Sequence, residues 1–113
     1  MIKTRRVYEK PSDEDGFRIL VDRLWPRGIS KESAMVDLWF KEVAPSEGLR
    51  RWFLHDLKKW TEFKKRYSTE LKVKKGIVDT IRSLEKEKGK ITLLYAAKDM
   101  EHNNAIFLKE YLG

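Results

Sequence analysis

The sequence predicts a single compact α/β domain, with a mixed or parallel sheet of about four strands covered by helices. Three observations indicate this class. Short β-branched segments lie early in the chain, helix-like segments with one apolar stripe occupy its second half, and residues 91–96 form a nearly continuous apolar run. Strands and helices in such an order pack as layers around one core. A chain of 113 residues has the length of one domain, so residues 1–113 are treated as a single unit.

Two strands are expected near the N-terminus. Residues 2–8 and 17–22 are short and rich in β-branched and apolar side chains, which favours strands, and Arg18 is the one interruption of the second. Residues 10–16 lie between them and contain Pro, Ser, Asp and Gly, which stabilise non-helical backbone. We therefore expect a loop that joins the two strands.

The next segment is less regular. Ser30 can cap a short helical turn that starts at Lys31, because its hydroxyl can accept a backbone N–H left unpaired by the first turn. Residues 35–43 are too short for periodicity to separate a strand from a helix. We favour a strand over residues 35–40.

Two helices are expected after this segment. Ser46 is placed to cap a helix that ends near His55, and Asp56 is placed to cap the following helix. In that second helix, apolar residues recur at intervals of three or four positions: Leu57, Trp60, Phe63, Tyr67 and Leu71. This spacing predicts one buried stripe.

The last third of the chain continues the pattern. Helical spacing is repeated by four apolar residues: Val73, Ile77, Ile81 and Leu84. Gly89 is a suitable stop, and residues 91–96 have the continuous apolar character of a central strand. Asp99 can cap a final helix, in which Ala105, Leu108 and Leu112 share a face, with Phe107 and Tyr111 beside it.

The amino-acid composition limits the kinds of site, the location and the partners that can be expected. The chain has no Cys, which excludes disulfides, thiol nucleophiles and Cys-ligated zinc. No signal-peptide run and no apolar window of about 20 residues is present, so we expect a cytoplasmic protein with no membrane partner. The net charge of +7 favours anionic partners, whether nucleotide, nucleic acid or acidic metabolite.

The loop over residues 21–28 is the first candidate for a binding site. Pro26 fixes its own φ angle and Gly28 permits a positive φ, so the loop should hold one shape. Arg23, Trp25 and Arg27 lie on it, and two guanidinium groups beside an indole suit a planar or phosphorylated anion.

A second polar group follows the strand expected at residues 91–96, namely Lys98, Asp99, His102, Asn103 and Asn104. Ligands of open α/β sheets lie beyond the carboxyl ends of the strands. If the two strands are parallel neighbours, Arg23, Arg27 and Lys98 would face one anion site near a helix N-terminus. In the structural alternative, Arg23 pairs with a carboxylate, Trp25 plugs the edge of the core and Asp99 only caps.

A third candidate group lies at the junction of two helices. Arg50 could bind charge, and His55 could act as a general acid or base with Asp56 as an orienting neighbour. The alternative is that Asp56 caps and His55 packs over the junction. The candidate ligand-binding residues are Arg23, Trp25, Arg27, Arg50, Lys98 and Asn103, and the candidates for proton transfer are His55 and Asp99.

No cofactor motif is present, and no metal site is expected. His55, His102, Asp99 and Glu101 could supply ligands, but no pair of His residues has the helical spacing that would make a metal site specific. The sequence therefore names neither a cofactor nor a metal.

Several of these segments together resemble one known family. They include Asp15-Gly16, the run LVDRLWPRGI at 20–29, Ala44-Pro45-Ser46, His55-Asp56, and TLLYAAKD at 92–99 followed by Asn103-Asn104-Ala105. So many segments in order resemble the YeaO-like family of uncharacterised proteins (domain of unknown function 488). The resemblance covers nearly the whole chain and implies a compact cytoplasmic α/β domain of bacteria and archaea. It implies no substrate.

Three classes of function remain open. The leading hypothesis is a site for an anionic, nucleotide- or phosphate-like small molecule, compatible with hydrolase or transferase activity. The first alternative is a nucleic-acid-binding module, because residues 50–75 carry ten basic and three acidic side chains. That surface could equally be a solvated face which attracts polyanions non-specifically. The second alternative is a non-catalytic protein-interaction subunit, suggested by the four Trp residues. The oligomeric state is left open.

Overall fold

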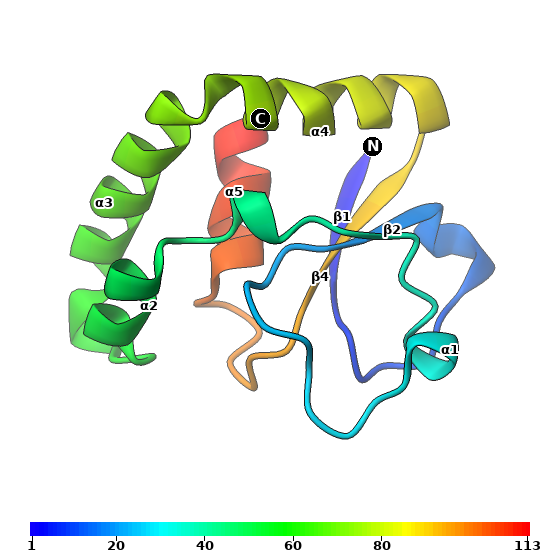
Figure 1. Ribbon diagram of the computed structural model, residues 1–113, viewed down its shortest axis with the longest axis horizontal. Coiled ribbons are helices and arrows are strands. Elements are labelled where there is room, and N and C mark those ends of the chain that lie inside the picture. The colour runs from blue at the N-terminus through cyan, green and yellow to red at the C-terminus, as the bar shows by residue number, and fades with distance from the viewer.

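The computed structural model describes residues 1–113 and contains one sheet of four parallel strands (Figure 1). The strands are β1 (Ile2–Arg6), β2 (Phe17–Leu20), β3 (Leu38–Trp39) and β4 (Ile91–Tyr95), in the spatial order β1-β4-β2-β3. The predicted α/β class is confirmed, and the sheet is parallel throughout. The carboxyl ends of β2 and β4 are therefore neighbours at one edge of the sheet.

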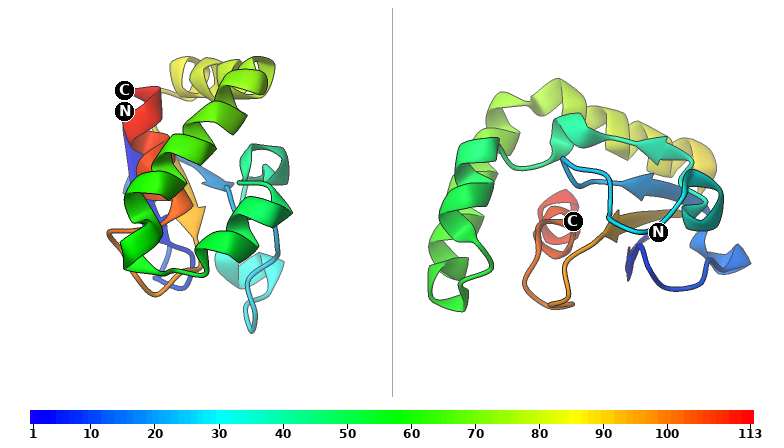
Figure 2. Two further views of the ribbon diagram at one scale, coloured as in Figure 1. Left: turned by 90° about the vertical axis from the view of Figure 1, so that its left-hand side faces the viewer. Right: turned by 60° about the horizontal axis from the view of Figure 1, so that its bottom comes forward.

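The helices are α1 (Lys31–Ala34), α2 (Glu47–Phe53), α3 (Trp60–Val73), α4 (Lys75–Lys88) and α5 (Asn104–Leu112), with short 3-10 helices at Asp13–Asp15, Lys41–Val43 and Leu57–Lys59. The helices α3, α4 and α5 lie on one face of the sheet, while α1 and the neighbouring loops lie on the other (Figures 1 and 2). No helix combines the length and apolar character needed to cross a bilayer.

Alternation along β4 divides the core into two parts. All five of its residues are buried, as predicted for a central strand. Leu93 faces the larger cluster, which includes Tyr67 and Leu108 from the helices, whereas Leu94 faces a smaller cluster with Leu20. Neighbouring residues of a strand point to opposite faces, so one five-residue strand serves both halves of the core.

The predicted caps explain where several helices begin and end. The hydroxyl of Ser30 accepts the backbone N–H of Ser33, and Ser46 accepts that of Leu49, at 3.1 and 3.2 Å. Gly89 ends α4 with a φ of +81° and donates its N–H to Glu85 at 2.8 Å. These termini follow the cap residues in the sequence.

The strand expected over residues 35–40 is shorter than predicted. Met35 has a φ of +47° because it closes α1, and only Leu38–Trp39 pairs with β2. The first two strands also end earlier than predicted, at Arg6 and Leu20. Beyond those points the chain leaves the sheet to form the loops at its carboxyl edge.

Two features of the predicted helical stripes were wrong. Asp56 caps the 3-10 turn before α3 rather than α3 itself, and Leu57 in that turn is exposed. Val73 is 84% exposed, because the backbone breaks at Lys74 and the apolar face of α4 starts in a new phase. Val78, which the spacing did not include, is buried instead.

The prediction that Asp99 caps the final helix was also wrong. The extended residue before α5 is Asn103, whose Oδ1 accepts the N–H of Ile106 at 3.0 Å. Asp99 accepts the N–H groups of Glu101 and His102, so it closes a turn that precedes the helix. Both side chains are good caps, and the sequence pattern does not show which one lies at the helix terminus.

Candidate functional site

A cavity of about 660 Å³ opens at the carboxyl edge of the sheet. Most of its lining comes from three segments: the loop after β2, the loop after β4 and α2 with the turn that follows it. Tyr8, Ala44, Pro45 and Phe63 complete the lining. The six candidate ligand-binding residues all line it, namely Arg23, Trp25, Arg27, Arg50, Lys98 and Asn103. The two candidates for proton transfer, His55 and Asp99, line it as well. The sheet order explains this convergence, because β2 and β4 are parallel neighbours.

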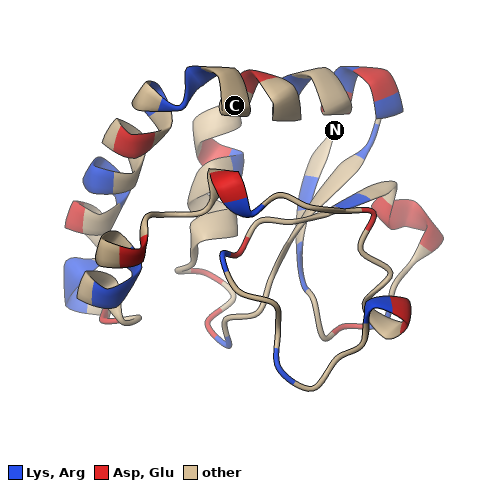
Figure 3. Ribbon diagram, in the orientation of Figure 1, with Lys and Arg blue, Asp and Glu red and all other residues tan.

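Basic residues line the cavity from the loop after β2, the loop after β4 and α2. Figure 3 marks the Lys and Arg positions in blue along the ribbon. Arg23 is half-buried and donates Nε–H to the carbonyl of Pro45 at 3.2 Å. Neither it nor the exposed Arg27 and Lys98 forms an ion pair with a carboxylate. Their charges are thus available to an anion in the cavity, and the alternative in which Arg23 pairs with a carboxylate does not match the structure.

Trp25 forms a fixed wall of the cavity. Its indole N–H donates to the carbonyl of Ile29 at 2.8 Å, and its ring meets Trp39 edge to face at 5.5 Å between centroids. The side chain also packs against the smaller core cluster. Trp25 therefore has both of the roles that the sequence suggested as alternatives: it closes the edge of the core, and it lines the cavity.

Arg50 enters the cavity already paired. Its guanidinium donates to Glu47 at 2.8 Å, and this hydrogen bond lowers the pKa of the exposed Glu47 carboxyl. Because one of its N–H groups is occupied, Arg50 can offer only the remaining groups to a ligand. Fewer of its N–H groups are free than in an unpaired arginine.

His55 follows a sharp turn at the end of α2. Leu54 and His55 both have positive φ angles, +43° and +57°, and the imidazole packs at 5.7 Å between centroids from Phe53. Asp56 does not orient it, since the Asp56 carboxylate accepts the N–H of Lys58 at 3.0 Å. The arrangement matches the alternative in which Asp56 caps and His55 packs over the junction.

Asp99 and Asn103 are occupied by contacts within their own loop. The N–H of Glu101 lowers the pKa of Asp99, and the N–H and ring of His102 lower it further. A carboxylate with a lowered pKa is a weak proton acceptor near neutral pH. Asn103 is buried, caps α5 and donates to the carbonyl of Asp99 at 2.9 Å. It shapes the cavity more than it offers polar atoms to it.

Two further residues, Asp22 and Asn104, line the cavity. Both lie in the polar groups that the sequence indicated, Asp22 in the loop over residues 21–28 and Asn104 after residues 91–96, but neither was among the candidate ligand-binding or proton-transfer residues. Asp22 Oδ2 accepts the N–H of Ala96 at 2.9 Å, and the carboxylate forms no ion pair. Burial raises its pKa, while Ala96, Asn104 and His55 lower it to a smaller extent. Asn104 donates to the carbonyl of Val21 at 2.9 Å. Their position directly after β2 and at the start of α5 is the signal that could have identified them.

The aromatic residues of the basic segment 50–75 are not free to stack on bases. Trp52 is covered by Arg66 at 4.2 Å and Lys59 at 5.1 Å from the ring centroid. Trp60 stacks on Phe63, and Tyr67 is fully buried. All four Trp residues of the chain are half-buried and pack against the core clusters. The aromatic content of this surface therefore belongs mainly to the core.

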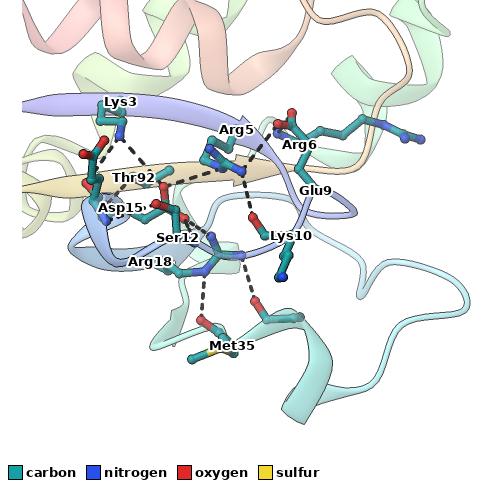
Figure 4. Close-up of polar contacts among 12 residues, drawn as sticks. Lys3, Arg5, Arg6, Glu9, Lys10, Ser12, Asp15, Arg18, Met35 and Thr92 are labelled. Atoms are coloured by element: carbon teal, nitrogen blue, oxygen red, sulfur yellow. Dashed lines mark hydrogen bonds and ion pairs between the residues drawn. The ribbon is translucent and has the colours of Figure 1, made fainter.

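A buried ion pair lies on the other side of the molecule, beside the amino-terminal part of β2 (Figure 4). Asp15 is fully buried, and Arg18 is 4% exposed and donates to it. Arg18 also donates to the carbonyls of Ala34 and Met35 at 2.8 and 3.0 Å. The residue that interrupts the apolar pattern of β2 thus attaches α1 to the sheet, which gives it a structural role.

No three His, Asp or Glu side chains come together in an arrangement that would hold a metal ion. The two His residues lie on different segments of the molecule, and each is engaged by an aromatic or acidic neighbour. The polar groups that line the cavity include basic, amide, carboxyl and imidazole groups.

The family model described as "Inactive DUF488-N3 subclade" matches residues 1–113. The chain belongs to the DUF488 family. It is 40% identical over 111 residues to the uncharacterised protein YeaO of Escherichia coli K12, which covers 98% of this chain and 96% of YeaO. It is 36% identical over 114 residues to the uncharacterised proteins Mb3100c of Mycobacterium bovis and Rv3073c of Mycobacterium tuberculosis, with 99% of this chain and 93% of each relative covered.

No solved structure gives a significant match. The resemblance to YeaO-like proteins that the sequence motifs indicated is confirmed by these comparisons. Membership of the DUF488 family brings no named substrate, because the relatives are themselves described as uncharacterised. What the cavity does must therefore be argued from its own residues.

Proposed function

We propose that this protein binds an anionic, nucleotide- or phosphate-like small molecule in the cavity at the carboxyl edge of the sheet. The observation that carries the proposal is the set of three basic side chains, Arg23, Arg27 and Lys98, which line one cavity and have no carboxylate partner. Unpaired cations around a concave surface attract anions at long range and hold them by charge-assisted hydrogen bonds.

The position of α5 supports the same proposal. This nine-residue helix begins at Asn104, which lines the cavity. The N-terminus of a helix carries a partial positive charge, so an anion in the cavity would be stabilised by it as well as by the basic side chains. A volume of about 660 Å³ is also within the usual range for small-molecule sites.

The groups considered for proton transfer support binding without turnover. Asp99 has a lowered pKa and is held by two backbone N–H groups, and His55 has no orienting carboxylate. The description of the matching family model contains the word inactive. Neither of these two groups is oriented as the base that hydrolase or transferase chemistry would need, so a binding function requires fewer assumptions.

A titration with inorganic phosphate and a panel of nucleotides tests the proposal. We expect Arg23→Ala to weaken binding about tenfold or more, because a charge-assisted hydrogen bond is lost. Lys86→Ala is the matched control: Lys86 is an exposed basic residue on α4, remote from the cavity, and its removal should leave affinity unchanged. Isothermal titration calorimetry gives the affinities.

Either of two results would contradict the proposal. The first is that no member of the panel binds to the wild-type protein. The second is that a ligand binds with the same affinity to the wild type and to alanine variants at Arg23, Arg27 and Lys98. Circular dichroism of each variant shows whether a loss of affinity comes from unfolding.

The basic segment 50–75 supports a second candidate function, nucleic-acid binding. Lys58, Lys65 and Lys72 are exposed and form no ion pair, so they could contact phosphates. Charge reversal at these three positions should abolish binding to DNA or RNA, and wild-type affinity should fall steeply with salt. Binding without a salt dependence would exclude this candidate, and the cavity variants separate it from the first.

A further inference from the structure

The cavity differs in character between its floor and its rim, and this difference bears on the ligand. The following inference rests on the proposed function. The rim is formed by the exposed basic residues Arg27, Arg50 and Lys98. The floor is formed by Phe53, which is 4% exposed, and by the less exposed polar residues Asp22 and Asn104. A ligand that fits both must have a phosphate at one end and a less charged body at the other.

The presence of Asp22 in the cavity is not explained by the binding of an anion alone. A carboxylate repels an anion, yet Asp22 lines the same cavity as the basic residues. Its Oδ2 accepts the N–H of Ala96 at 2.9 Å, the side-chain amide of Asn104 also lowers its pKa by hydrogen bonding, and no cation pairs with it. Each carboxylate oxygen can accept more than one hydrogen bond, so a half-buried carboxylate without a cation partner at the floor can accept further donors from a ligand.

Asn104 and the aromatic walls add to this description. Its Nδ2 donates to the carbonyl of Val21, which leaves the amide oxygen without a partner in the protein. Trp25 lines the cavity from the loop after β2, and Phe53 and His55 line it from the end of α2. Aromatic side chains thus reach the cavity from two separate elements and suit the faces of a planar ring.

We propose that the ligand is a nucleoside phosphate whose base offers two adjacent N–H donors, as guanine does, with the base at Asp22 on the floor and the phosphate at the basic rim. A carboxylate has acceptors only, and each oxygen can accept more than one hydrogen bond. Guanine presents a ring N–H beside an exocyclic amino group, so both donors can be satisfied by one carboxylate. Adenine and cytosine place an acceptor next to their amino group, and that acceptor would face the carboxylate unpaired.

A ligand series tests the orientation of the base. Calorimetric titrations of the wild-type protein are made with GMP, IMP, AMP and inorganic phosphate. IMP is a matched probe, because it keeps the ring N–H of GMP but lacks the exocyclic amino group. We expect the affinity to follow GMP, then IMP, then AMP, with about tenfold or more between the first and the last.

Variants at the floor test the role of Asp22. Asp22→Asn keeps the side-chain shape and an oxygen for the N–H of Ala96, and it should reduce the ratio of GMP to AMP affinity to about one. The affinity for inorganic phosphate should rise, because a charge that repels the anion is removed. Asp79→Asn, an exposed acid on α4, is the control and should leave the ratio as it is in the wild type.

The outcomes separate the two proposals. Equal affinities for GMP and AMP, or a ratio that Asp22→Asn does not change, overturn the inference but leave phosphate binding intact. If inorganic phosphate binds but no nucleotide does, the inference is also overturned while phosphate binding stands. If neither phosphate nor a nucleotide binds, the proposed function fails and the inference fails with it. If Asp22→Asn does not fold, the wild-type ligand series decides.

Discussion

Asp22 links stability to the proposed function at the level of one residue. Its pKa is raised mainly by burial, so the folded protein holds this proton to a higher pH than the unfolded chain does. The contribution of Asp22 to the free energy of unfolding is therefore lost as the pH rises from the unfolded pKa through the folded one. At neutral pH the ionised carboxylate opposes folding.

Asp22→Asn should accordingly increase stability at neutral pH, because it removes a buried charge and keeps an acceptor for Ala96. The difference from the wild type should shrink as the pH falls through the acid range, where Asp22 is protonated in both states. Urea unfolding followed at several pH values measures it. A variant that is less stable at neutral pH would show that the carboxylate stabilises the folded protein.

At this scale the sequence predicted the cavity well and its detailed contacts poorly. Arg23 and Lys98 could be assigned to one site because they directly follow two strands. The buried ion pair of Asp15 and Arg18 could not be predicted, because an acidic residue in a loop and a basic residue in a strand are ordinarily exposed. Burial of that pair depends on α1 lying over the sheet, which no local pattern indicates.

At the level of elements, the entry into β2 depends on a glycine. Gly16 has a φ of +64°, and a Cβ at this position would lie 2.5 Å from the carbonyl oxygen of Lys90. That carbonyl accepts the N–H of Phe17 at 3.0 Å, which begins the contact of β2 with β4. The close approach requires the absence of a side chain, because the opposing atom belongs to the backbone.

We expect Gly16→Ala to lower the free energy of unfolding by about 3 kcal/mol, from the strained φ and the clash together. Gly28→Ala is the matched control: its φ is +74° but nothing lies within 4 Å of the added Cβ, so the cost should be about 1 kcal/mol, from strain alone. Chemical denaturation gives both values. Equal costs for the two variants would show that the chain near Lys90 moves aside freely.

The helices show which elements can be predicted and why. Ser46 and Gly89 carry their own capping geometry, so α2 begins and α4 ends as expected. The break at Lys74 has no such signal, because no side chain caps α4 there and Gly76 lies inside that helix, and the exposure of Val73 follows from the break. Local chemistry thus predicts termini, whereas the phase between two helices depends on packing.

At the level of the whole molecule, the net charge of +7 affects folding and binding in opposite directions. Like charges repel one another more in the compact state, and salt screens this repulsion over a Debye length of about 10 Å at 0.1 M. Salt also screens the attraction between the cavity and an anion. Salt concentration should therefore change stability and anion binding in opposite directions.

Raising the concentration of potassium chloride to about 0.5 M should increase the melting temperature and weaken phosphate binding in the same preparation. Calorimetry measures both quantities, by scanning and by titration. A melting temperature that falls with salt would indicate that ion pairs such as that of Arg66 and Glu62 outweigh the repulsion. Sucrose at equal osmolality serves as the uncharged control.

The place of β4 in the sheet has a consequence for how the protein comes into existence in a cell. Ile2 pairs with Ile91 and Ile19 pairs with Leu93, so β1 and β2 do not pair with each other, because β4 lies between them. While a ribosome is still synthesising the middle of the chain, β1 remains unpaired, because β4 has not yet been made. Such long-range pairing slows folding and prolongs the exposure of unpaired strands. The cavity, which needs the loop after β4, is complete only after residues 96–104 have been synthesised.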